Sequence, residues 1–446
     1  MQVEAWLQRA ARTAPTVTAL QAPDAQVSYE QLLWAACSGA AELSELGARA
    51  GGRVGIALVP GFGFSQALHA CFLLGAVAVP VDGRLSAAER ERIVAGADVI
   101  VERPLRDNRA EPTGTARNYL CASVSHDLDA PCAVIHTSGT TSAPRPIELT
   151  YGNFLWSALG SGVALGVDPR ERWLCALPLS HVGGLSILVR SAIYATTAVV
   201  HERFEAERVR VSLQEQGITL VSLVATTLAR LLDAGLREPP HLRCALTGGG
   251  PVPAALVRRA RAAGVPVVET YGLTECCSQA ATAPLAAIAN DTGAGVPLFC
   301  TRTEIAPDGE IVLSGPTVAR GSRAADGRLH TGDLGHIDDR GFLHVTGRKA
   351  DTIVSGGENI APSEVEAVLE SCPGVLEAAV VGREDEQWGE AVTAIVVLVP
   401  GVNLEESTVR EHCAVRLAPF KVPKHVTFVS ESLPRTASGK LLRREL

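Results

Sequence analysis

The sequence has no long run of lysine or arginine, and its 40 basic residues are outnumbered by 48 acidic ones, for a formal net charge of −8. Proteins that bind nucleic acid neutralise its phosphates with clustered positive charge. We therefore expect no nucleic acid among the partners of this chain.

Targeting and membrane segments are missing as well. Residues 1–6 contain no basic stretch followed by an apolar core, so no export signal is expected. The most apolar long window, residues 67–81, is shorter than the roughly 20 residues that a membrane-spanning helix needs. These features predict a cytoplasmic protein without a transmembrane segment.

The eleven cysteines form no C-x-x-C pair, and only Cys276 and Cys277 are adjacent. Disulfide frameworks and zinc sites are built from regularly spaced cysteines. We expect reduced thiols that are buried as small apolar residues.

With 446 residues, 47% of them hydrophobic, the chain is too long for one compact core, and two or three domains are expected. Residues 28–31 fit a capping box at the start of a helix that continues to Gly47. Buried strands are predicted at residues 54–59 and 76–81, with a helix at residues 64–74 between them. Such alternation is typical of an α/β fold with mainly parallel sheets covered by helices.

The pattern changes at residue 303. Short alternating strands are joined there by the turns at residues 308–309 and 338–341, which predicts a small antiparallel β subdomain at residues 303–347. Beyond Lys349 helices and strands return, beginning with a helix that opens at Pro362. The predicted domains are residues 1–347 and 348–446.

Residues 136–146 combine hydroxyl side chains, one glycine and a cation. Backbone N–H groups around Gly139 and the neighbouring hydroxyls can donate to a phosphate, and Arg145 supplies positive charge. A Ser/Thr-rich surface turn explains this segment equally well when it is taken alone.

Three further segments combine glycines with side chains that suit a ligand. Residues 178–190 place His181 beside two glycines and end an apolar run on Arg190. Taken alone, a core histidine explains His181 equally well, and an arginine in such a position is more often a surface cation than an anion clamp. The glycines at residues 248–250 permit either close approach of a flat ligand or a tight turn. In residues 271–275 a tyrosine can stack on a base and a glutamate can bind Mg²⁺.

These segments resemble, in order and spacing, the core motifs of the acyl-adenylate-forming superfamily, which includes acyl-CoA synthetases, adenylation domains of peptide synthetases and beetle luciferases. The resemblance spans most of the chain. It implies a large N-terminal domain of helix-covered sheets and a small mobile α+β C-terminal domain. The motifs are residues 137–145, Tyr-Gly-Leu-Thr-Glu at 271–275, Thr-Gly-Asp at 331–333, Gly-Arg-Lys-Ala-Asp at 347–351, Gly-Gly-Glu-Asn-Ile at 356–360 and Arg-Thr-Ala-Ser-Gly-Lys at 435–440.

The resemblance also implies the chemistry. Such enzymes use ATP and Mg²⁺ to join a carboxylic acid to AMP, and CoA then accepts the acyl group. Lys440 would stabilise the charge that develops at the α-phosphate, which can be worth a factor of ~10²–10³ in rate; without the motif before it, Lys440 would be one more solvated basic residue. The small domain would swing about a hinge at Lys349 between the two steps.

The implied site residues fall into four groups. The catalytic residues are Lys440, His181 and Glu275, and the Mg²⁺ ligands are Thr141 and Glu275. The ATP- or AMP-binding residues are Thr137, Ser138, Gly139, Thr140, Thr141, Arg145, Gly248, Gly249, Gly250, Tyr271, Gly272, Thr274, Asp333 and Arg348. The CoA and hinge residues are Lys349, Gly356, Gly357 and Glu358.

Within the superfamily, residues 177–191 and 248–251, together with Ser278-Gln279 after Glu275, look most like the o-succinylbenzoate–CoA ligases of menaquinone or phylloquinone biosynthesis. Their acid is an aromatic ring with two carboxylates, one activated and one only recognised. The resemblance places Arg190 at the recognised carboxylate, aided by His181, Ser222 and Ser278. The partners expected are small molecules, with a homodimer left open.

One departure concerns the phosphate loop. Relatives usually carry Gly-Lys-Pro-Lys-Gly where this chain has Ser142-Ala143-Pro144-Arg145-Pro146. Arg145 keeps the charge, but Pro146 stiffens the loop, so we expect weaker ATP binding. Two alternatives remain: a ligase for another acid or for a carrier protein, and a non-catalytic adenylate-binding protein.

Overall fold

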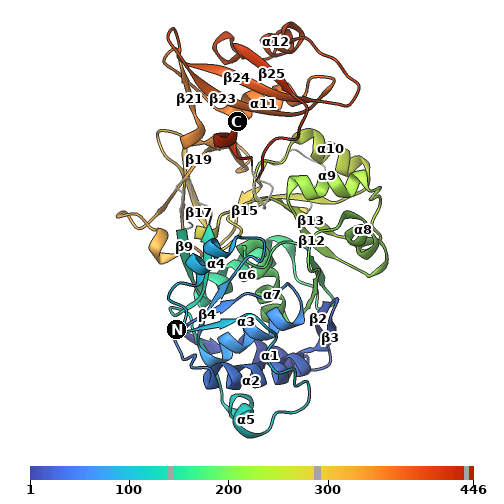
Figure 1. Ribbon diagram of the computed structural model, residues 1–446, viewed down its shortest axis with the longest axis vertical. Coiled ribbons are helices and arrows are strands. Elements are labelled where there is room, and N and C mark those ends of the chain that lie inside the picture. Colours follow the sequence, from blue (N-terminus) through green and yellow to red (C-terminus); the bar gives the residue numbers. More distant parts are fainter. Residues whose placement is uncertain (138–144, 286–292, 436–440) are drawn as a thin grey trace.

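The computed structural model describes residues 1–137, 145–285, 293–435 and 441–446 (Figure 1). The predicted site residues Ser138, Gly139, Thr140, Thr141 and Lys440 lie outside the described residues.

The first of two large sheets has five short strands, in the order β6 (Val99–Val101), β4 (Arg53–Ile56), β5 (Val77–Pro80), β8 (Pro131–Thr137) and β9 (Arg145–Thr150). All are parallel except β9, which returns antiparallel to β8. The strands predicted at residues 54–59 and 76–81 are β4 and β5, which are apolar because both faces of this sheet are buried. A separate antiparallel pair is formed by β1 (Gln2–Glu4) and β7 (Ser125–Asp127).

The second sheet has nine strands, in the order β16 (Val296–Pro297), β15 (Ala281–Thr282), β14 (Val267–Tyr271), β13 (Cys244–Thr247), β12 (Leu220–Leu223), β10 (Arg172–Cys175), β11 (Thr197–Val200), β2 (Thr18–Ala22) and β3 (Ala25–Ser28). The strands from β14 to β2 are parallel. Ligands of such sheets bind beyond the carboxyl ends of the strands, where residues 248–250 and 271–275 follow β13 and β14.

Helices cover both sheets. The largest core combines residues of both sheets with α1 (Trp6–Thr13), α2 (Tyr29–Glu45), α3 (Phe62–Leu74), α6 (Tyr151–Leu165) and α7 (Val182–Tyr194). The other face of the second sheet packs against α8 (Ala206–Glu215), α9 (Ala225–Asp233) and α10 (Ala254–Ala262). The other face of the first sheet packs against Ile93 and Val94 of α4 (Ala87–Val94), and α5 (Gly114–Cys121) lies against α2.

The predicted capping box is confirmed at the start of α2. Ser28 Oγ accepts the Gln31 N–H at 3.3 Å, and Gln31 Oε1 accepts the Ser28 N–H at 3.0 Å. Two of the free N–H groups at the helix start are thereby satisfied, which is why the helix begins at this residue.

An antiparallel sheet follows, as predicted, from β17 (Arg302–Ile305), β18 (Glu310–Ser314), β19 (Leu329–Ile337) and β20 (Leu343–Arg348). The C-terminal unit, at the top of Figure 1, has its own core and contains β21 (Ile353–Ser355), β22 (Glu358–Ile360), α11 (Pro362–Glu370), β23 (Val375–Asp385), β24 (Gly389–Leu398), α12 (Glu406–Ala414) and β25 (His425–Val429). Short 3₁₀ helices are η1 (Thr274–Cys276), η3 (Arg320–Ser322), η4 (Lys349–Asp351), η5 (Pro419–Lys421) and η6 (Arg443–Glu445). The predicted fold class is confirmed, and the hinge at Lys349, in η4 between β20 and β21, stays a prediction.

The ten cysteines whose side chains the structure describes are all buried, as expected. Within the described ranges, no helix combines the length and the apolar character that crossing a bilayer requires.

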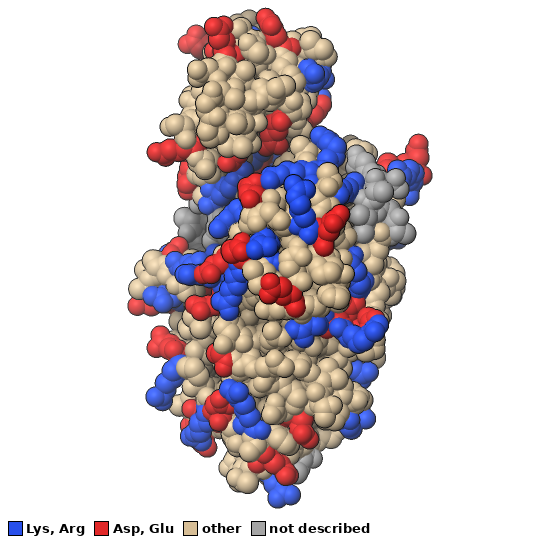
Figure 2. Space-filling model, turned by 90° about the vertical axis from the view of Figure 1, so that its right-hand side faces the viewer, with Lys and Arg blue, Asp and Glu red and all other residues tan. Residues whose placement is uncertain are grey.

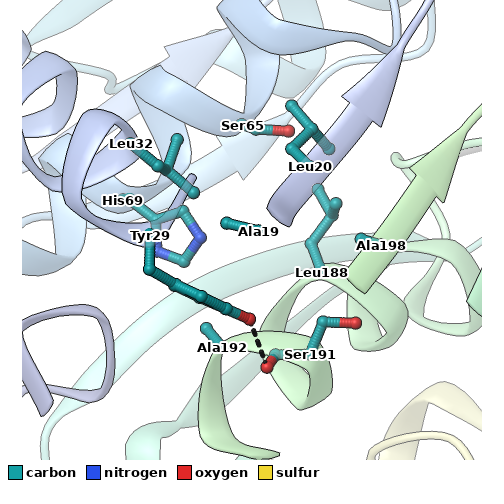
Figure 3. Close-up of a pocket in the computed structure, with 10 residues that line it drawn as sticks. All are labelled: Ala19, Leu20, Tyr29, Leu32, Ser65, His69, Leu188, Ser191, Ala192 and Ala198. Carbon is teal, nitrogen blue, oxygen red and sulfur yellow. Dashed lines mark hydrogen bonds between the residues drawn. The ribbon is translucent and has the colours of Figure 1, made fainter. Parts of the chain in front are cut away.

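A small cavity of about 10 Å³ lies where β2, α2, α3 and α7 meet, lined by Tyr29, Ser65, His69 and Ser191 among others (Figure 3). The Tyr29 hydroxyl donates to the Ser191 carbonyl oxygen at 2.6 Å. A space of this size holds one water molecule at most. It is therefore an internal cavity of the core and not a substrate site.

Three buried histidines in this core are held neutral. Burial lowers the pKa of His69 to about 4, that of His126 to about 3 and that of His201 to about 4. His126 also stacks on Tyr151, with ring centroids 4.1 Å apart, and its Nε2 accepts the Trp6 backbone N–H at 3.4 Å. Protonation of Nε2 would therefore break a contact as well as bury a charge.

These histidines predict a loss of stability on the acid side. The unfolded chain takes up protons near pH 6.5, whereas the folded chain does so only near pH 4 or below, so the free energy of unfolding falls as the pH drops through this window. Each histidine contributes up to about 1.4 kcal/mol per pH unit. Urea unfolding between pH 7 and pH 4.5 measures the slope. His126→Asn should lower the slope of the free energy of unfolding against pH by the equivalent of about one bound proton. His241→Asn, at an exposed position, is the control and should leave the slope unchanged. An unchanged slope in His126→Asn would contradict this account.

Candidate active site

Asp333, on β19, is the best-partnered carboxylate at the predicted nucleotide site. It is buried, with 4% of its surface exposed. The Tyr271 hydroxyl donates to Oδ2 at 2.7 Å, and Arg348 Nε donates to Oδ1 at 2.7 Å. Each carboxylate oxygen has two lone pairs, so both can still accept a hydrogen bond from a ribose hydroxyl.

Tyr271 ends β14 and keeps its proton. Burial, reinforced by the charge of Asp333, raises the pKa of the Tyr271 phenol far above its ordinary value. Its hydroxyl is therefore a permanent donor to the carboxylate, and the position of the ring is fixed by that bond.

The glycine turn after β13 lies directly against the strand that carries Tyr271. A Cβ on Gly248 would lie 2.5 Å from the Thr270 carbonyl oxygen, and Gly249 has a φ of +80°. Side chains are excluded at the first position by contact and disfavoured at the second by backbone strain. The structure thus brings Gly248, Gly249 and Gly250 next to Tyr271.

The segment after Tyr271 folds into a tight, strained turn. A Cβ on Gly272 would lie 1.5 Å from the Ser278 carbonyl oxygen. Two consecutive non-glycine residues have left-handed φ values, +54° at Cys277 and +92° at Ser278. Such conformations cost on the order of 1–3 kcal/mol each and persist only where surrounding contacts enforce them.

Thr274 and Glu275 lie in η1 within this turn. The half-buried Glu275 carboxylate forms no ion pair with the residues that the structure describes. A carboxylate without a protein cation suits Mg²⁺, which prefers hard oxygen ligands. The other predicted ligand, Thr141, lies outside the described residues.

Only the two ends of the predicted phosphate loop are described. Thr137 ends β8 and pairs in register with Arg145, the exposed first residue of β9. Arg145 and Thr137 are therefore neighbours across the hairpin.

Arg190, on α7, is a buried cation. Only 2% of its surface is exposed, and no carboxylate of a described residue lies within ion-pair distance. Its Nη2 donates to Ser157 Oγ at 2.9 Å, whereas Nε has no hydrogen-bond partner among the described residues. Burial lowers the pKa of the Arg190 guanidinium, although arginine keeps its charge in proteins.

Trp173 and Ser222 belong to the same cluster. The Arg190 guanidinium lies 5.6 Å from the centre of the Trp173 ring, and the indole N–H donates to Ser222 Oγ at 3.0 Å. Elements β10, β12 and α7 thus bring Arg190, Trp173 and Ser222 together.

His181 does not join this cluster. It is the N-cap residue of α7, so its Cα lies about 13 Å from that of Arg190 along the helix. Burial lowers the pKa of His181, an effect that nearby Asp82 opposes. Burial acts against ionisation of Asp82 too, but Arg84 and His181 lower the pKa of its carboxyl to about 2. His181 and Arg190 therefore lie more than two turns of α7 apart.

The predicted hinge and CoA residues lie at the base of the C-terminal unit. Lys349 Nζ pairs with Asp308 at 2.6 Å and with Glu310 at 3.3 Å. Gly356 and Gly357 both have positive φ and form the turn between β21 and β22, followed by the exposed Glu358. Among the described residues, no hydrogen bond or ion pair joins this turn to Tyr271 or Asp333.

Sequence reasoning missed three residues of the site. Trp173, Ser157 and Cys277 contact Arg190 or its partners, yet none lies in a motif. Two consecutive residues with left-handed φ leave no mark in the sequence, because neither is glycine.

The geometry agrees with the comparison of the chain with known families. The sequence profile of AMP-binding enzymes matches residues 7–322, and that of the AMP-binding enzyme C-terminal domain matches residues 364–440. The chain therefore belongs to the AMP-binding enzyme family.

The 2-succinylbenzoate–CoA ligase of Bacillus licheniformis is 40% identical over 474 residues, which span 99% of this chain and 98% of the relative. Two structures of o-succinylbenzoate CoA synthetase from Bacillus subtilis are similar to this chain, each with a TM-score of 0.88 and 36% sequence identity. The structure with the acyl-adenylate intermediate covers 100% of this chain and 98% of its own chain. The structure with ATP and magnesium ion covers 100% of both chains.

A double mutant of the same Bacillus subtilis enzyme, bound with its product analogue, has 36% identity and covers 100% of this chain and 98% of its own, but has a TM-score of only 0.72. The elements of this chain are therefore arranged more like the ATP and adenylate complexes than like the product-analogue complex.

Tyr271→Phe tests the nucleotide site. The variant keeps the ring but removes the donor to Asp333; because hydrogen bonds to charged groups are worth about 1.5–3 kcal/mol, we expect the KM for ATP to rise about tenfold or more. Pyrophosphate release at varied ATP measures it. The matched control is Tyr119→Phe on α5, which should leave the KM for ATP unchanged. Equal KM values for the two variants would show that the hydrogen bond from Tyr271 to Asp333 does not contribute to ATP binding.

Proposed function

We propose that this chain is an AMP-forming acid–CoA ligase that activates 2-succinylbenzoate with ATP and transfers the acyl group to CoA. Full-length similarity to enzymes of that name supports the reaction. The observation in this chain that carries the acid assignment is Arg190, a buried cation with no acidic partner among the described residues.

In the first step, one carboxylate oxygen of the acid attacks the α-phosphorus of ATP. The bond from that phosphorus to the bridging oxygen breaks, and pyrophosphate leaves. Asp333 and Tyr271 hold the nucleoside, so that the α-phosphate is fixed relative to the acid. Lys440 stabilises the negative charge that develops during attack, a role that rests on the family motif.

Mg²⁺ neutralises phosphate charge in this step. Glu275 would hold it, because its carboxylate faces no cation among the described residues. Thr137 and Arg145, at the two ends of the phosphate loop, are the described residues best placed to contact the β- and γ-phosphates.

The second carboxylate of the acid is recognised and not activated. A charge inside a protein is costly unless it is paired, and the pair of Arg190 with a substrate carboxylate would relieve that cost for both. Ser222, whose Oγ accepts the Trp173 indole N–H, and Ser278 would add hydroxyl groups, and His181 lies at the N-terminal end of α7.

In the second step, the CoA sulfur attacks the acyl carbon, the bond from that carbon to the AMP oxygen breaks, and the thiol proton is released. We place Gly356, Gly357 and Glu358 at the CoA arm after rotation at Lys349. Figure 2 shows basic side chains gathered beside the C-terminal unit, and α10 contributes Arg258, Arg259 and Arg261 to this part of the molecule. Such charge suits a co-substrate with several phosphates.

The direct test is a CoA-ligation assay with 2-succinylbenzoate against a panel of other acids, read by mass. Formation of 2-succinylbenzoyl-CoA at the highest kcat/KM is the expected result. Preference for another acid would overturn the specificity but not the reaction class. Absence of pyrophosphate release with every acid would favour a non-catalytic adenylate-binding protein, and transfer only to a carrier protein would favour an adenylation unit.

The Arg190→Ala variant tests whether Arg190 recognises the second carboxylate of the acid. Loss of a charge-assisted contact should lower kcat/KM for 2-succinylbenzoate about a hundredfold, but that for plain benzoates only severalfold. Arg190→Lys, which keeps the charge without the planar fork, should fall between. Equal losses on both acids would remove Arg190 from this role.

A further inference from the structure

Three buried polar groups from distant parts of the chain meet beneath the acid site. They are the Arg190 guanidinium on α7, the Ser157 hydroxyl on α6 and the Cys277 carbonyl oxygen in the strained turn. Ser157 has 1% of its surface exposed and Arg190 has 2%. Water therefore cannot replace these contacts when one is removed.

The direction of the hydrogen bonds in this group is fixed by chemistry. A guanidinium can only donate, so Ser157 Oγ must be the acceptor of the 2.9 Å bond from Arg190 Nη2. The hydroxyl proton of Ser157 is then free for the Cys277 carbonyl oxygen, 2.6 Å away. Ser157 thus links the cation to the turn in a single orientation.

The turn at the far end needs such a support. Cys277 and Ser278 both have left-handed φ, and the Ser278 carbonyl oxygen packs so closely on Gly272 that a Cβ there would lie 1.5 Å from it. Within the turn, the N–H groups of Cys277 and Ser278 donate to Thr274 and Leu273. Among the described residues, the bond from Ser157 ties the Cys277 carbonyl oxygen to the neighbouring helix α6.

We propose that Ser157 is a positioning residue of the acid site: it fixes Arg190 and the Cys277–Ser278 turn relative to each other. Ser157 contacts neither ATP nor the acid. It determines the spacing between the cation that recognises the second carboxylate and the turn that carries Ser278. The proposal rests on the proposed function, because it deepens the account of the acid-binding site.

Ser157→Ala removes the link without adding volume. We expect kcat/KM for 2-succinylbenzoate to fall about tenfold through a higher KM for the acid, with the KM for ATP within twofold of the parent. The matched control is Ser186→Ala on α7, one turn before Arg190, which removes a buried hydroxyl without a partner among the described residues. This control should behave as the parent.

A double-mutant cycle separates positioning from general damage. If Ser157 acts through Arg190, then Ser157→Ala combined with Arg190→Ala should be little worse than Arg190→Ala alone. Losses that multiply, or KM values for acid and ATP that rise together, would overturn the proposal. An unchanged KM for the acid in Ser157→Ala would overturn it as well.

The failure of this proposal is distinguishable from failure of the proposed function, because the parent protein is assayed beside the variants. A parent that does not ligate 2-succinylbenzoate refutes the function. A parent that does, with an equally active Ser157→Ala, refutes only the positioning role. Should Ser157→Ala not fold, Ser157→Cys, whose thiol is a weak donor, is judged by the same criteria.

Discussion

The proposed nucleotide site depends on one buried negative charge, the Asp333 carboxylate. A buried carboxylate is tolerated only when it is partnered, and here the partners come from β14 through Tyr271 and from β20 through Arg348. The second sheet and the antiparallel sheet are thereby tied at the point where the ribose is expected. Arg348 precedes Lys349, which forms ion pairs with Asp308 and Glu310 at the start of the C-terminal unit. One short stretch of chain therefore links the proposed nucleotide site to the predicted hinge.

The proposed acid site is organised by a charge of the opposite sign. Arg190 has no acidic neighbour among the described residues, and its described contacts are the Trp173 ring and the Ser157 hydroxyl. Such an arrangement leaves the cation available to a substrate carboxylate while its position is fixed by neutral groups. The strained turn at Cys277 and Ser278 is adjacent in sequence to Glu275, so the proposed Mg²⁺ ligand and the proposed acid-binding residue Ser278 lie in one segment.

Local patterns in the sequence predicted what local physics determines. The capping box at Ser28, the antiparallel strands around residues 308–309 and the buried parallel strands of the first sheet were all found where they were expected. The apolar run ending at Arg190 was singled out, but it was not predicted to be the helix α7, which separates the Cα atoms of His181 and Arg190 by about 13 Å along its axis. Ser157 and Trp173 could not be found, because they reach Arg190 through the packing of helices and strands distant in sequence. The resemblance to a known family supplied the roles that spacing alone left open.

The measurement that tests this account most directly is the KM for ATP of Asp333→Asn, taken from pyrophosphate release in the presence of the acid. Asparagine keeps the size of the side chain but presents an amide to Arg348 and loses the charge. Because two hydrogen bonds to a charged acceptor are weakened together, the account predicts a KM at least about a hundredfold above that of the parent, in a protein whose urea unfolding remains cooperative. A folded variant that releases pyrophosphate with the parent KM would contradict it.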